Sequence, residues 1–360
     1  MTVKILFVLP TLRMGGAEKV MISLFNNIDK GFLEPSIVAF SNGSLKSKIK
    51  DQSRLTVLEH DSVLSGVFGF SQLVRSINPD VVFSTHSHLN ALLCFLKKLN
   101  IIKSKLIIRE SNYLSKQQSH GKSLYEKYFI TFMIKTFYHN ADHLICQSNE
   151  MLEDIYSFIP KYTVPATVIY NPIENIPPYI NKGSKKQIIS IGRLDPQKNH
   201  QLLIKAFDKI KNTIPHSLVI IGDGSEYNNL RKIIVKKGLE DRVQLTGFIE
   251  NVWDEYSNSA LFVLSSNYEG FPNVILEAMA NSTPVVSSDC PSGPKEIIQH
   301  GINGFLFEVG DIDGLAKCIK HAILTETAIS SIRHRAYLDV KAYSITHIVN
   351  KYENIFQTNN

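Results

Sequence analysis

The sequence predicts two doubly wound α/β domains in tandem, each built on a parallel β-sheet. Strand-like runs rich in Val and Ile alternate with helical patterns from one end of the chain to the other, which is typical of βαβ units. A chain of 360 residues is also too long for one ordinary hydrophobic core. The alternation breaks once, around residues 163–186, where Asn171-Pro172, Pro177-Pro178 and Asn181-Lys182-Gly183-Ser184 have turn and linker composition. We expect a cleft between the carboxyl ends of the two sets of strands, where such folds bind ligands.

The first domain is expected to span residues 1–176. Its predicted strands are Val3–Pro10, Ser36–Phe40, Leu55–Leu58, Asp80–Ser84, Leu106–Arg109 and His143–Cys146. Helices are expected between the strands, for example over Ala17–Asn27 and Leu89–Leu99. The last helical stretch, at about residues 345–360, is suggested to cross back onto this domain.

The second domain is expected to span residues 177–344 and to repeat the same rhythm. Its predicted strands are Gln187–Ile191, Leu218–Ile221, Val243–Leu245, Leu261–Leu264, Pro284–Ser287 and Gly304–Glu308.

The composition is that of a globular protein, and no apolar run approaches the length of a membrane-spanning helix. The first apolar run, Val3 to Leu9, contains Lys4 and lacks a cleavage pattern, so we do not expect a signal peptide. Four scattered cysteines without metal-ligand spacing indicate reduced thiols, and we expect a cytoplasmic protein.

The net charge of +6 is unevenly distributed. Between Lys97 and Lys135 there are nine basic residues against Glu110 and Glu126, with aromatic and aliphatic residues interleaved. The basic positions are 97, 98, 103, 105, 109, 116, 122, 127 and 135. A helix of this type can lie on an anionic bilayer surface, although a solvated helix face explains the pattern equally well. Nucleic-acid binding is less attractive, because no nucleic-acid-binding motif accompanies the charge.

The most informative stretch runs from Glu269 to Glu277. A buried strand leads into a tight turn with Gly270, and Pro272 suits the first turn of an apolar helix. The helix rises about 7–8 Å between Pro272 and Glu277. Two carboxylates on either side of a helix N-terminus, where the dipole favours anions, suit two polyols joined by a charged linker. A nucleotide sugar has this layout, although two unrelated surface glutamates remain the alternative for this segment alone.

Cationic side chains follow the strand Gln187–Ile191. Arg193 and Lys198 bracket one short loop, and together they can neutralise a diphosphate leaving group as its charge grows. Asp195 and Asn199 in the same loop fit turn and helix-cap hydrogen bonds better than chemistry.

Other loops carry weaker signals. Gly15 and Gly16 precede a helix and can expose backbone N–H groups to an anion, although a simple loop is as good an explanation. Gly222-Asp223-Gly224 fits a structural turn, and Asp311 with Asp313 fits helix capping better than metal binding. No Walker loop and no complete G-x-G-x-x-G follows the first strand, which lowers the odds for an NTPase or a dehydrogenase.

Taken together, these motifs resemble the retaining GT-B glycosyltransferases of family four. The set comprises Gly15-Gly16-Ala17-Glu18, Gly192-Arg193-Leu194 with Lys198-Asn199-His200, Gly222-Asp223-Gly224, and Glu269 with Glu277 after seven intervening residues. It covers nearly the whole chain in the family's order, including Tyr170-Asn171-Pro172. The stretch from Ser288 to Ile298, with Gly301-Ile302-Asn303-Gly304, is similar to a bacterial subgroup that adds galactose or N-acetylhexosamine units to lipid-linked saccharides.

The resemblance implies a role for each matching residue. Glu269, Arg193, Lys198 and Glu110 would be catalytic, with Arg193 and Lys198 holding the donor diphosphate. Glu277 would hold the ribose hydroxyls. The other donor-binding positions would be Gly15, Gly16, Phe248, Ile249, Gly270, Phe271, Pro272 and Asn273.

One departure concerns the first domain. Many members place a histidine on the loop that here contains Glu110, so Glu110 would take that place, or Arg109 and Asn112 would bind the acceptor. His86 and His88 follow another strand end and are further acceptor-binding candidates. No double-displacement nucleophile is evident, which agrees with the same-face retaining reaction that the resemblance implies.

We therefore expect a hexosyltransferase that moves galactose or an N-acetylhexosamine from a UDP-sugar to a polyprenyl-diphosphate-linked saccharide with an α product. It would need no metal or other cofactor, bind no nucleic acid, and sit at the inner face of the cell membrane. A UDP-sugar 2-epimerase on the same scaffold, or a non-catalytic component of a polysaccharide assembly complex, are the alternatives.

Overall fold

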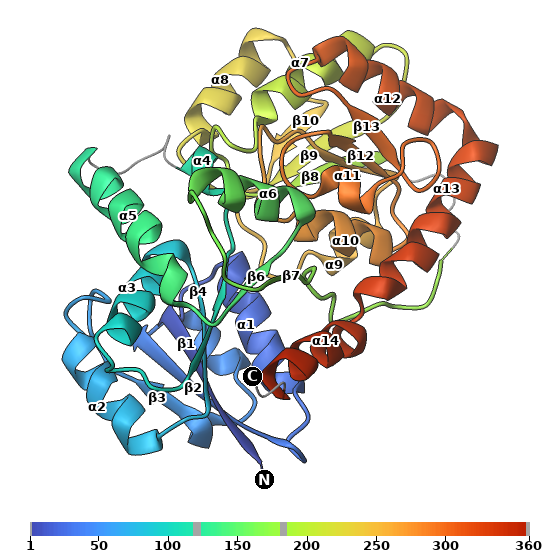
Figure 1. Cartoon of the computed structure of the whole chain (residues 1–360). Coiled ribbons are helices and arrows are strands. Elements are labelled where there is room, and N and C mark those ends of the chain that lie inside the picture. Colours follow the sequence, from blue (N-terminus) through green and yellow to red (C-terminus); the bar gives the residue numbers. More distant parts are fainter. Residues whose placement is uncertain (1, 118–123, 181–185, 358–360) are drawn as a thin grey trace. The chain divides into compact units, whose positions relative to one another are not determined.

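The computed structural model describes residues 2–117, 124–180 and 186–357, and the side chains of residues 116–127 and 326–328 are not described. Lys122 and the predicted linker residues Asn181 to Ser184 lie outside the described residues. The chain divides into two compact units (Figure 1). The first unit comprises residues 1–174 and 345–360, and the second comprises residues 175–344.

The first unit is a parallel sheet with strand order β3-β2-β1-β4-β5-β6-β7. Its strands are β1 Val3–Thr11, β2 Leu33–Ser41, β3 Leu55–Val57, β4 Val81–Thr85, β5 Lys105–Arg109, β6 His143–Cys146 and β7 Ala166–Val168. Its α-helices are α1 Gly16–Asn27, α2 Val67–Ile77, α3 Ser87–Lys98, α4 Leu114–Gln117, α5 Leu124–Phe137, α6 Asn149–Phe158 and α14 Ile345–Gln357. Short 3-10 helices cover Ser44–Lys48, Gln52–Arg54 and Tyr138–Asn140.

Both faces of this sheet are covered, because its side chains alternate with a period of two. In β1, Leu6 and Val8 pack with α2, α3, α5 and α6, whereas Ile5, Phe7 and Leu9 pack with α1 and α14. The covering helices are visible on the two faces in Figure 1.

The C-terminal helix α14 belongs to the first unit. Its apolar face includes Tyr352 and Phe356, whose rings lie 5.6 and 5.2 Å from the ring of Phe83 in β4. Both side chains are at most 2% exposed, and burial of such a side chain stabilises a fold by about 1.5–3 kcal/mol. The helix therefore packs on the first sheet although it follows the second unit in the sequence.

The second unit is a parallel sheet with strand order β10-β9-β8-β11-β12-β13. Its strands are β8 Gln187–Ile191, β9 Ser217–Ile221, β10 Val243–Leu245, β11 Leu261–Leu264, β12 Val285–Ser288 and β13 Phe305–Phe307. Its α-helices are α7 His200–Ile210, α8 Tyr227–Lys236, α9 Trp253–Ser257, α10 Asn273–Ala280, α11 Pro294–Ile297, α12 Ile312–Leu324 and α13 Glu326–Asp339, followed by a 3-10 helix at Val340–Tyr343. Leu261 and Val263 of β11 pack with α7, α8 and α12, whereas Phe262 points to the other face and contacts Tyr256 of α9.

The predicted doubly wound parallel sheets are confirmed, with one strand missed. β7 lies inside the stretch in which the sequence pattern breaks, and it pairs with β6. It has three residues, all half-buried, and follows Pro165. Such a short edge strand carries too little alternation to be recognised. Among the described residues, no helix combines the length and apolarity that crossing a membrane requires.

Candidate active site

Several candidate side chains of the second unit gather where β8 and β11 end. These strands are neighbours in the sheet, so their following loops lie together. Lys198 Nζ donates a 2.7 Å hydrogen bond to Glu269 Oε1, and the two side chains are only 13% and 6% exposed. Ser266 Oγ donates to the same oxygen at 2.6 Å. Two residues that the sequence singled out separately thus form one almost buried ion pair.

The two loops are joined by further hydrogen bonds. Ser265 Oγ donates to the carbonyl of Lys198 at 2.9 Å, and Gln197 Nε2 donates to the carbonyl of Tyr268 at 3.0 Å. Asn267 Nδ2 donates to the carbonyl of Pro196 at 2.8 Å. Because backbone atoms accept all three bonds, the position of Lys198 relative to Glu269 is set by the loops themselves.

Arg193 differs from Lys198 in its exposure. Its guanidinium is 74% exposed and contacts Asp195 Oδ2 at 3.2 Å and Gln197 Oε1 at 3.4 Å. Exposed pairs of this kind contribute little to stability, so Arg193 can exchange these partners for an anionic ligand. Asp195 Oδ1 also accepts from the amide of Lys198 at 3.2 Å, which confirms the predicted turn role.

The Gly222-Asp223-Gly224 turn braces this loop. A Cβ on Gly222 would lie 1.9 Å from the carbonyl oxygen of Gly192, and one on Gly224 would lie 2.4 Å from that of Leu194. Both glycines have positive φ. The turn passes directly over the Arg193 loop, and the structural role predicted for it is confirmed.

The turn before α10 is held by the loop that follows β12. The amide of Glu269 donates to the carbonyl of Pro291 at 2.6 Å, and Ser292 Oγ donates to the carbonyl of Gly270 at 2.9 Å. Phe271 and Pro272 are buried. Pro272 was expected in the first helical turn, but α10 begins one residue later, at Asn273, and Pro272 is the N-cap.

Glu277 lies one turn into α10 and is half-buried. Its Oε2 accepts a 2.9 Å hydrogen bond from the hydroxyl of Tyr256, which is fully buried. Burial, together with the charge of Glu277, raises the pKa of the Tyr256 hydroxyl, so it stays a hydrogen-bond donor at any ordinary pH. Tyr256 orients this carboxylate, and nothing in its local sequence indicates that role.

Phe248 and Ile249 follow β10 at the other end of the same sheet edge. Gly247 has φ +77°, and its carbonyl accepts from the amide of Gly222 at 2.9 Å. Phe248 is 65% exposed and Ile249 is half-buried. An aromatic ring presented to solvent beside the site is suited to stacking on a planar ligand.

In the first unit, the paired glycines lie at the start of α1. Gly15 is its N-cap, and a Cβ on Gly15 would lie 2.1 Å from Glu18 Oε2. A Cβ on Gly16 would meet nothing within 4 Å. The Glu18 carboxylate therefore occupies the space above Gly15, while the space beside Gly16 is open.

The two histidines lie at the start of α3. His86 Nε2 is 2.8 Å from Glu18 Oε1, and the rings of His86 and His88 are 5.9 Å apart. Burial alone would raise the pKa of Glu18, but the hydrogen bond and charge of His86 outweigh it, so the pKa lies below its usual value. Glu18 was part of a motif in the sequence but had no role there.

Glu110 has a buried environment that the sequence did not indicate. The side chain is 0% exposed, and its carboxylate accepts hydrogen bonds from Tyr138 OH at 2.8 Å and Ser87 Oγ at 2.8 Å. The amides of Ser111 and Asn112 donate to it at 3.0 and 3.3 Å. Burial raises the pKa of Glu110 in spite of these bonds. As it lies here, Glu110 holds the turn after β5 and presents no surface to a sugar.

The position of Arg109 also differs from both expectations for it, namely a contact with the acceptor and a place on a charged surface. It is fully buried and donates from Nε to Tyr352 OH at 3.1 Å, from Nη1 to Thr85 Oγ1 at 3.3 Å, and from Nη2 to Asn171 Oδ1. It ties β5 to β4, to α14 and to the Asn171-Pro172 segment. Asn112, two residues beyond Glu110, is half-buried.

The acidic residues Asp311 and Asp313 make separate local contacts. Asp311 caps α12, because its Oδ1 accepts from the amides of Asp313 and Gly314 at 3.0 and 2.9 Å. Asp313 Oδ1 pairs with Lys209. Within the described ranges, no group of three or more His, Cys, Asp and Glu side chains is arranged to hold a metal ion.

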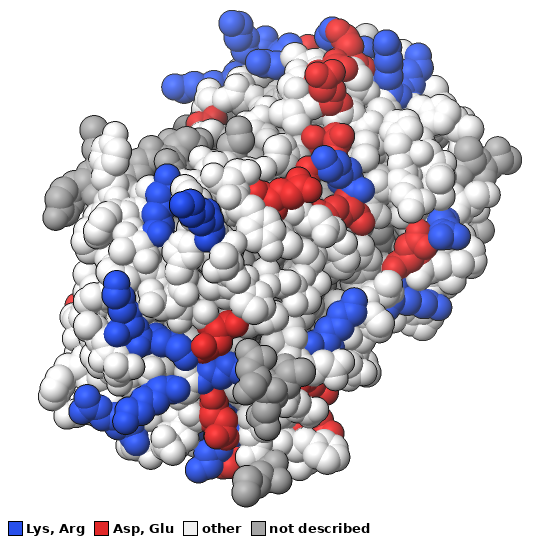
Figure 2. Space-filling view, viewed as in Figure 1, with Lys and Arg blue, Asp and Glu red and all other residues white. Residues whose placement is uncertain are grey.

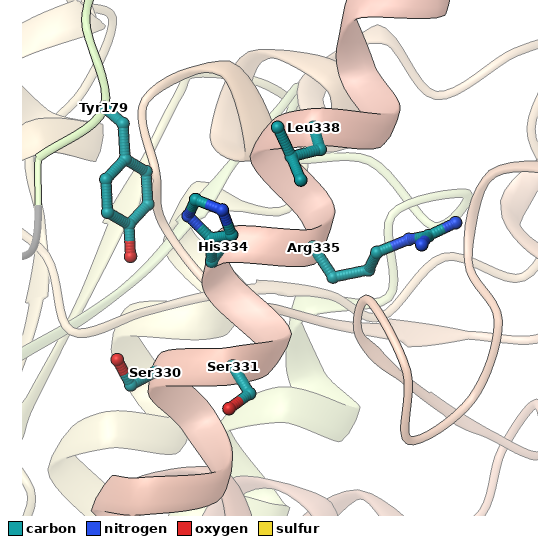
Figure 3. Close-up of a pocket in the computed structure, with 6 residues that line it drawn as sticks. All are labelled: Tyr179, Ser330, Ser331, His334, Arg335 and Leu338. Atoms are coloured by element: carbon teal, nitrogen blue, oxygen red, sulfur yellow. The ribbon is translucent and has the colours of Figure 1, made fainter.

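An open hollow lies elsewhere on the second unit, along α13 (Figure 3). Tyr179 faces His334 across it, with ring centroids 4.9 Å apart, and Arg335 extends away from the helix. Ser330, Ser331 and Leu338 complete the lining. None of the residues predicted for the site lies in this hollow.

Comparisons with known proteins agree with this architecture. Residues 173–340 match the family of glycosyl transferases group 1. The chain is 29% identical over 286 residues to the N-acetylgalactosamine-N,N'-diacetylbacillosaminyl-diphospho-undecaprenol 4-alpha-N-acetylgalactosaminyltransferase of Campylobacter jejuni, covering 76% of this chain and 75% of that protein. It is 25% identical over 362 residues, 96% of both chains, to the GalNAc-alpha-(1->4)-GalNAc-alpha-(1->3)-diNAcBac-PP-undecaprenol alpha-1,4-N-acetyl-D-galactosaminyltransferase of the same organism.

Among solved structures, Anabaena Alr3699/HepE in complex with UDP superposes with a TM-score of 0.81 at 20% identity, covering 98% of this chain and 99% of that one. This likeness concerns the fold. Neither the relatives nor the fold favours the epimerase alternative. The chain therefore has the GT-B fold of glycosyltransferases, and its residues 173–340 match the group 1 glycosyl transferases.

Proposed function

We propose that this glycosyltransferase moves a hexose, galactose or an N-acetylhexosamine, from a UDP-sugar to a polyprenyl-diphosphate-linked saccharide with retention of the α configuration. The observation that carries the proposal is the buried Lys198–Glu269 pair beside the exposed Arg193. The names of both Campylobacter relatives include an undecaprenol-linked diphosphate saccharide, and HepE was crystallised with UDP.

In the donor complex, Arg193 and Lys198 hold the diphosphate. Arg193 gives up its exposed contacts with Asp195 and Gln197, which costs little. Glu269 contacts the sugar beside the backbone of residues 270–273, Glu277 binds the ribose hydroxyls, and Phe248 with Ile249 lies against the base. In the first unit, the open space beside Gly16 leaves room for an anion at the start of α1.

The reaction breaks the bond between the anomeric carbon and the phosphate oxygen, whose electron pair leaves with UDP. The acceptor oxygen forms the new bond on the same face of the sugar, and its proton passes to the leaving phosphate. Arg193 and Lys198 stabilise the charge that grows on the diphosphate. Because two cationic side chains supply this stabilisation, we propose that no metal ion is needed.

The acceptor binds to the first unit near His86 and His88, with Asn112 close to the turn that Glu110 anchors. Glu110 and Arg109 contribute by holding this framework, since neither has exposed surface.

We further propose that α5 rests on the inner face of the cell membrane. Tyr128, Phe129 and Phe132 are 73%, 46% and 60% exposed, and their spacing places them on one side of the helix. Figure 2, which shows one face of the molecule, has basic side chains at the lower left, where the first unit lies. Of the nine basic residues between Lys97 and Lys135, Arg109 is buried and Lys97 is paired with Asp142. Insertion of the aromatic side chains therefore contributes more to membrane binding than the sequence indicated.

Transfer is tested with the purified chain, radiolabelled UDP-sugars and undecaprenyl-diphosphate-linked saccharides. We expect an α-linked product from at least one donor, and no transfer from any donor would overturn the proposal. Conversion of the donor sugar without acceptor would instead indicate an epimerase. Arg193→Ala and Glu277→Ala are expected to abolish turnover. Lys209→Ala, which breaks a pair whose side chains are 50% and 67% exposed, serves as the matched control and should leave it unchanged.

The membrane proposal needs its own assay. The chain is sedimented with vesicles of phosphatidylglycerol and phosphatidylcholine at rising salt concentrations, and binding should weaken as the Debye length shrinks. A Tyr128→Ser/Phe132→Ser variant should bind less at every salt concentration. Equal binding of this variant and the unmodified chain would exclude α5 as the contact.

A further inference from the structure

Each unit carries a glutamate paired with a basic side chain at the same topological position. In the second sheet, β8 and β11 are neighbours at the point where the strand order reverses, with β9 and β10 on one side and β12 and β13 on the other. The Lys198–Glu269 pair lies at the carboxyl ends of β8 and β11. In the first sheet, the corresponding point lies between β1 and β4. Glu18 follows β1 and His86 follows β4, and they meet there at 2.8 Å. Doubly wound sheets bind their ligands at this point.

The contacts of Glu18 fix its carboxylate. The side chain is 8% exposed, and one oxygen lies against His86 while the other lies over Gly15. A Cβ at position 15 would lie 2.1 Å from this second oxygen, so the Glu18 carboxylate would have to move to make room for it. Glycine at this position therefore leaves room for the Glu18 carboxylate where it lies.

His86 is held in an unusual backbone conformation. Its φ of +76° is rarely adopted by a residue with a side chain, and it places the imidazole at the N-cap of α3. The next residue, Ser87, is anchored to Glu110 at 2.8 Å, and the carbonyl of His86 accepts from the amide of Asn90 at 2.9 Å. Strained conformations of this kind persist where the surroundings enforce them, and they cluster at functional sites.

We propose that Glu18 is a positioning residue that holds His86 Nε2–H, so that Nδ1 accepts a hydrogen bond from the attacking hydroxyl when the acceptor binds. The proton of this hydroxyl turns from Nδ1 to the leaving phosphate as the new bond forms. In a neutral imidazole only one nitrogen carries a proton, so a proton held on Nε2 leaves the lone pair on Nδ1. Glu18 and His88 are the titratable groups that lie against the His86 ring. The inference rests on the proposed function, because it assigns the acceptor hydroxyl to this point of the first unit.

The kinetic test compares Glu18→Ala with Glu18→Gln, using the donor and acceptor that support transfer. The alanine variant should lose at least tenfold in kcat/KM for the acceptor while the dissociation constant for UDP stays unchanged. The glutamine variant should recover most of the loss, because its amide oxygen still accepts from Nε2–H. Asp311→Ala is the control, since it removes a carboxylate from a helix N-terminus that has no histidine. Wild-type acceptor kinetics in Glu18→Ala, or no recovery in Glu18→Gln, would overturn the inference.

Gly15 provides a second, independent variant. Gly15→Ala should reproduce the acceptor defect of Glu18→Ala, and combining the two substitutions should add nothing, because both remove the same contact. An additive double variant would show that Gly15 acts by another route.

A spectroscopic readout separates this inference from the proposed function. In the full chain labelled with 15N-histidine, the Nε2 proton of His86 should exchange slowly with solvent, and this protection should vanish in Glu18→Ala and return in Glu18→Gln. Equal protection in all three proteins would overturn the positioning role. An unmodified chain that transfers no sugar would refute the proposed function, and these spectra would still decide whether Glu18 positions His86.

Discussion

Replacing Lys198 by alanine separates the structural from the chemical role of the buried ion pair. Removal of one partner from a buried pair costs about 3–5 kcal/mol, because the remaining charge loses its compensation. Glu269 keeps the 2.6 Å bond from Ser266 Oγ, so we expect the lower end, about 3 kcal/mol. For a unit of this size, 1 kcal/mol corresponds to about 2–4 °C in Tm, which gives a loss of about 6–12 °C.

A second substitution should reverse the stability loss without restoring catalysis. In Lys198→Ala/Glu269→Gln the uncompensated charge is gone, so urea denaturation should show recovery of about 2 kcal/mol. Transfer should stay at least about 100-fold below the wild-type rate, since a group that stabilises the leaving diphosphate is absent.

The control for this cycle is Lys209→Ala, whose pair with Asp313 is exposed and should contribute less than about 1 kcal/mol. A double variant no more stable than Lys198→Ala would refute the charge argument. Wild-type turnover in Lys198→Ala would refute the diphosphate role.

Three further perturbations follow from single contacts. Phe248→Ala should weaken UDP binding about 5- to 150-fold by calorimetry, since stacking on a base is worth about 1–3 kcal/mol, whereas Phe32→Ala, with a similarly exposed ring, should not. Tyr256→Phe removes the 2.9 Å hydrogen bond to Glu277, which costs about 1–1.5 kcal/mol of donor binding free energy. The donor KM should therefore rise about tenfold at nearly constant kcat. An unchanged KM would exclude Glu277 from the donor site. Burial, with a smaller contribution from the charge of Lys198, lowers the pKa of His200 to about 3. The unfolded chain therefore takes up the proton first, and stability falls by about 1.4 kcal/mol per pH unit as pH drops from about 6.5 towards 3. His200→Leu should lose about 2 kcal/mol less than wild type between pH 6.5 and pH 5 in urea denaturation, and equal losses would contradict this.

Much of the fold was predictable because its signals are local. Strands such as His143–Cys146 and Gln187–Ile191 agree with the prediction at both ends, since a buried parallel strand is a short apolar run bounded by turns. Four candidate site residues could be identified for a similar reason, because each follows a strand end or lies near a helix start. They are Arg193, Lys198, Glu269 and Glu277. Ser266 had a usable signal as well, because it is a polar residue two positions after a buried strand.

Other parts of the site had no such signal. In the sequence, Glu110 looks like a loop residue and Arg109 like the last residue of a strand, yet both are fully buried. Their burial comes from partners far along the chain, including Tyr352, Asn171 and Tyr138. The role of Tyr256 beside Glu277 is equally invisible, since the two residues lie on different helices.

The amino-acid sequence by itself determined the strands, the helices and the residue types available to bind a nucleotide sugar, because periodicity and turn chemistry act over a few neighbouring residues. Only the tertiary structure decided which of those residues meet. Lys198 reaches Glu269, and Glu18 reaches His86, because parallel neighbours in a sheet bring together loops that are 71 and 68 residues apart. Strand order is set by long-range packing, and no local pattern encodes it.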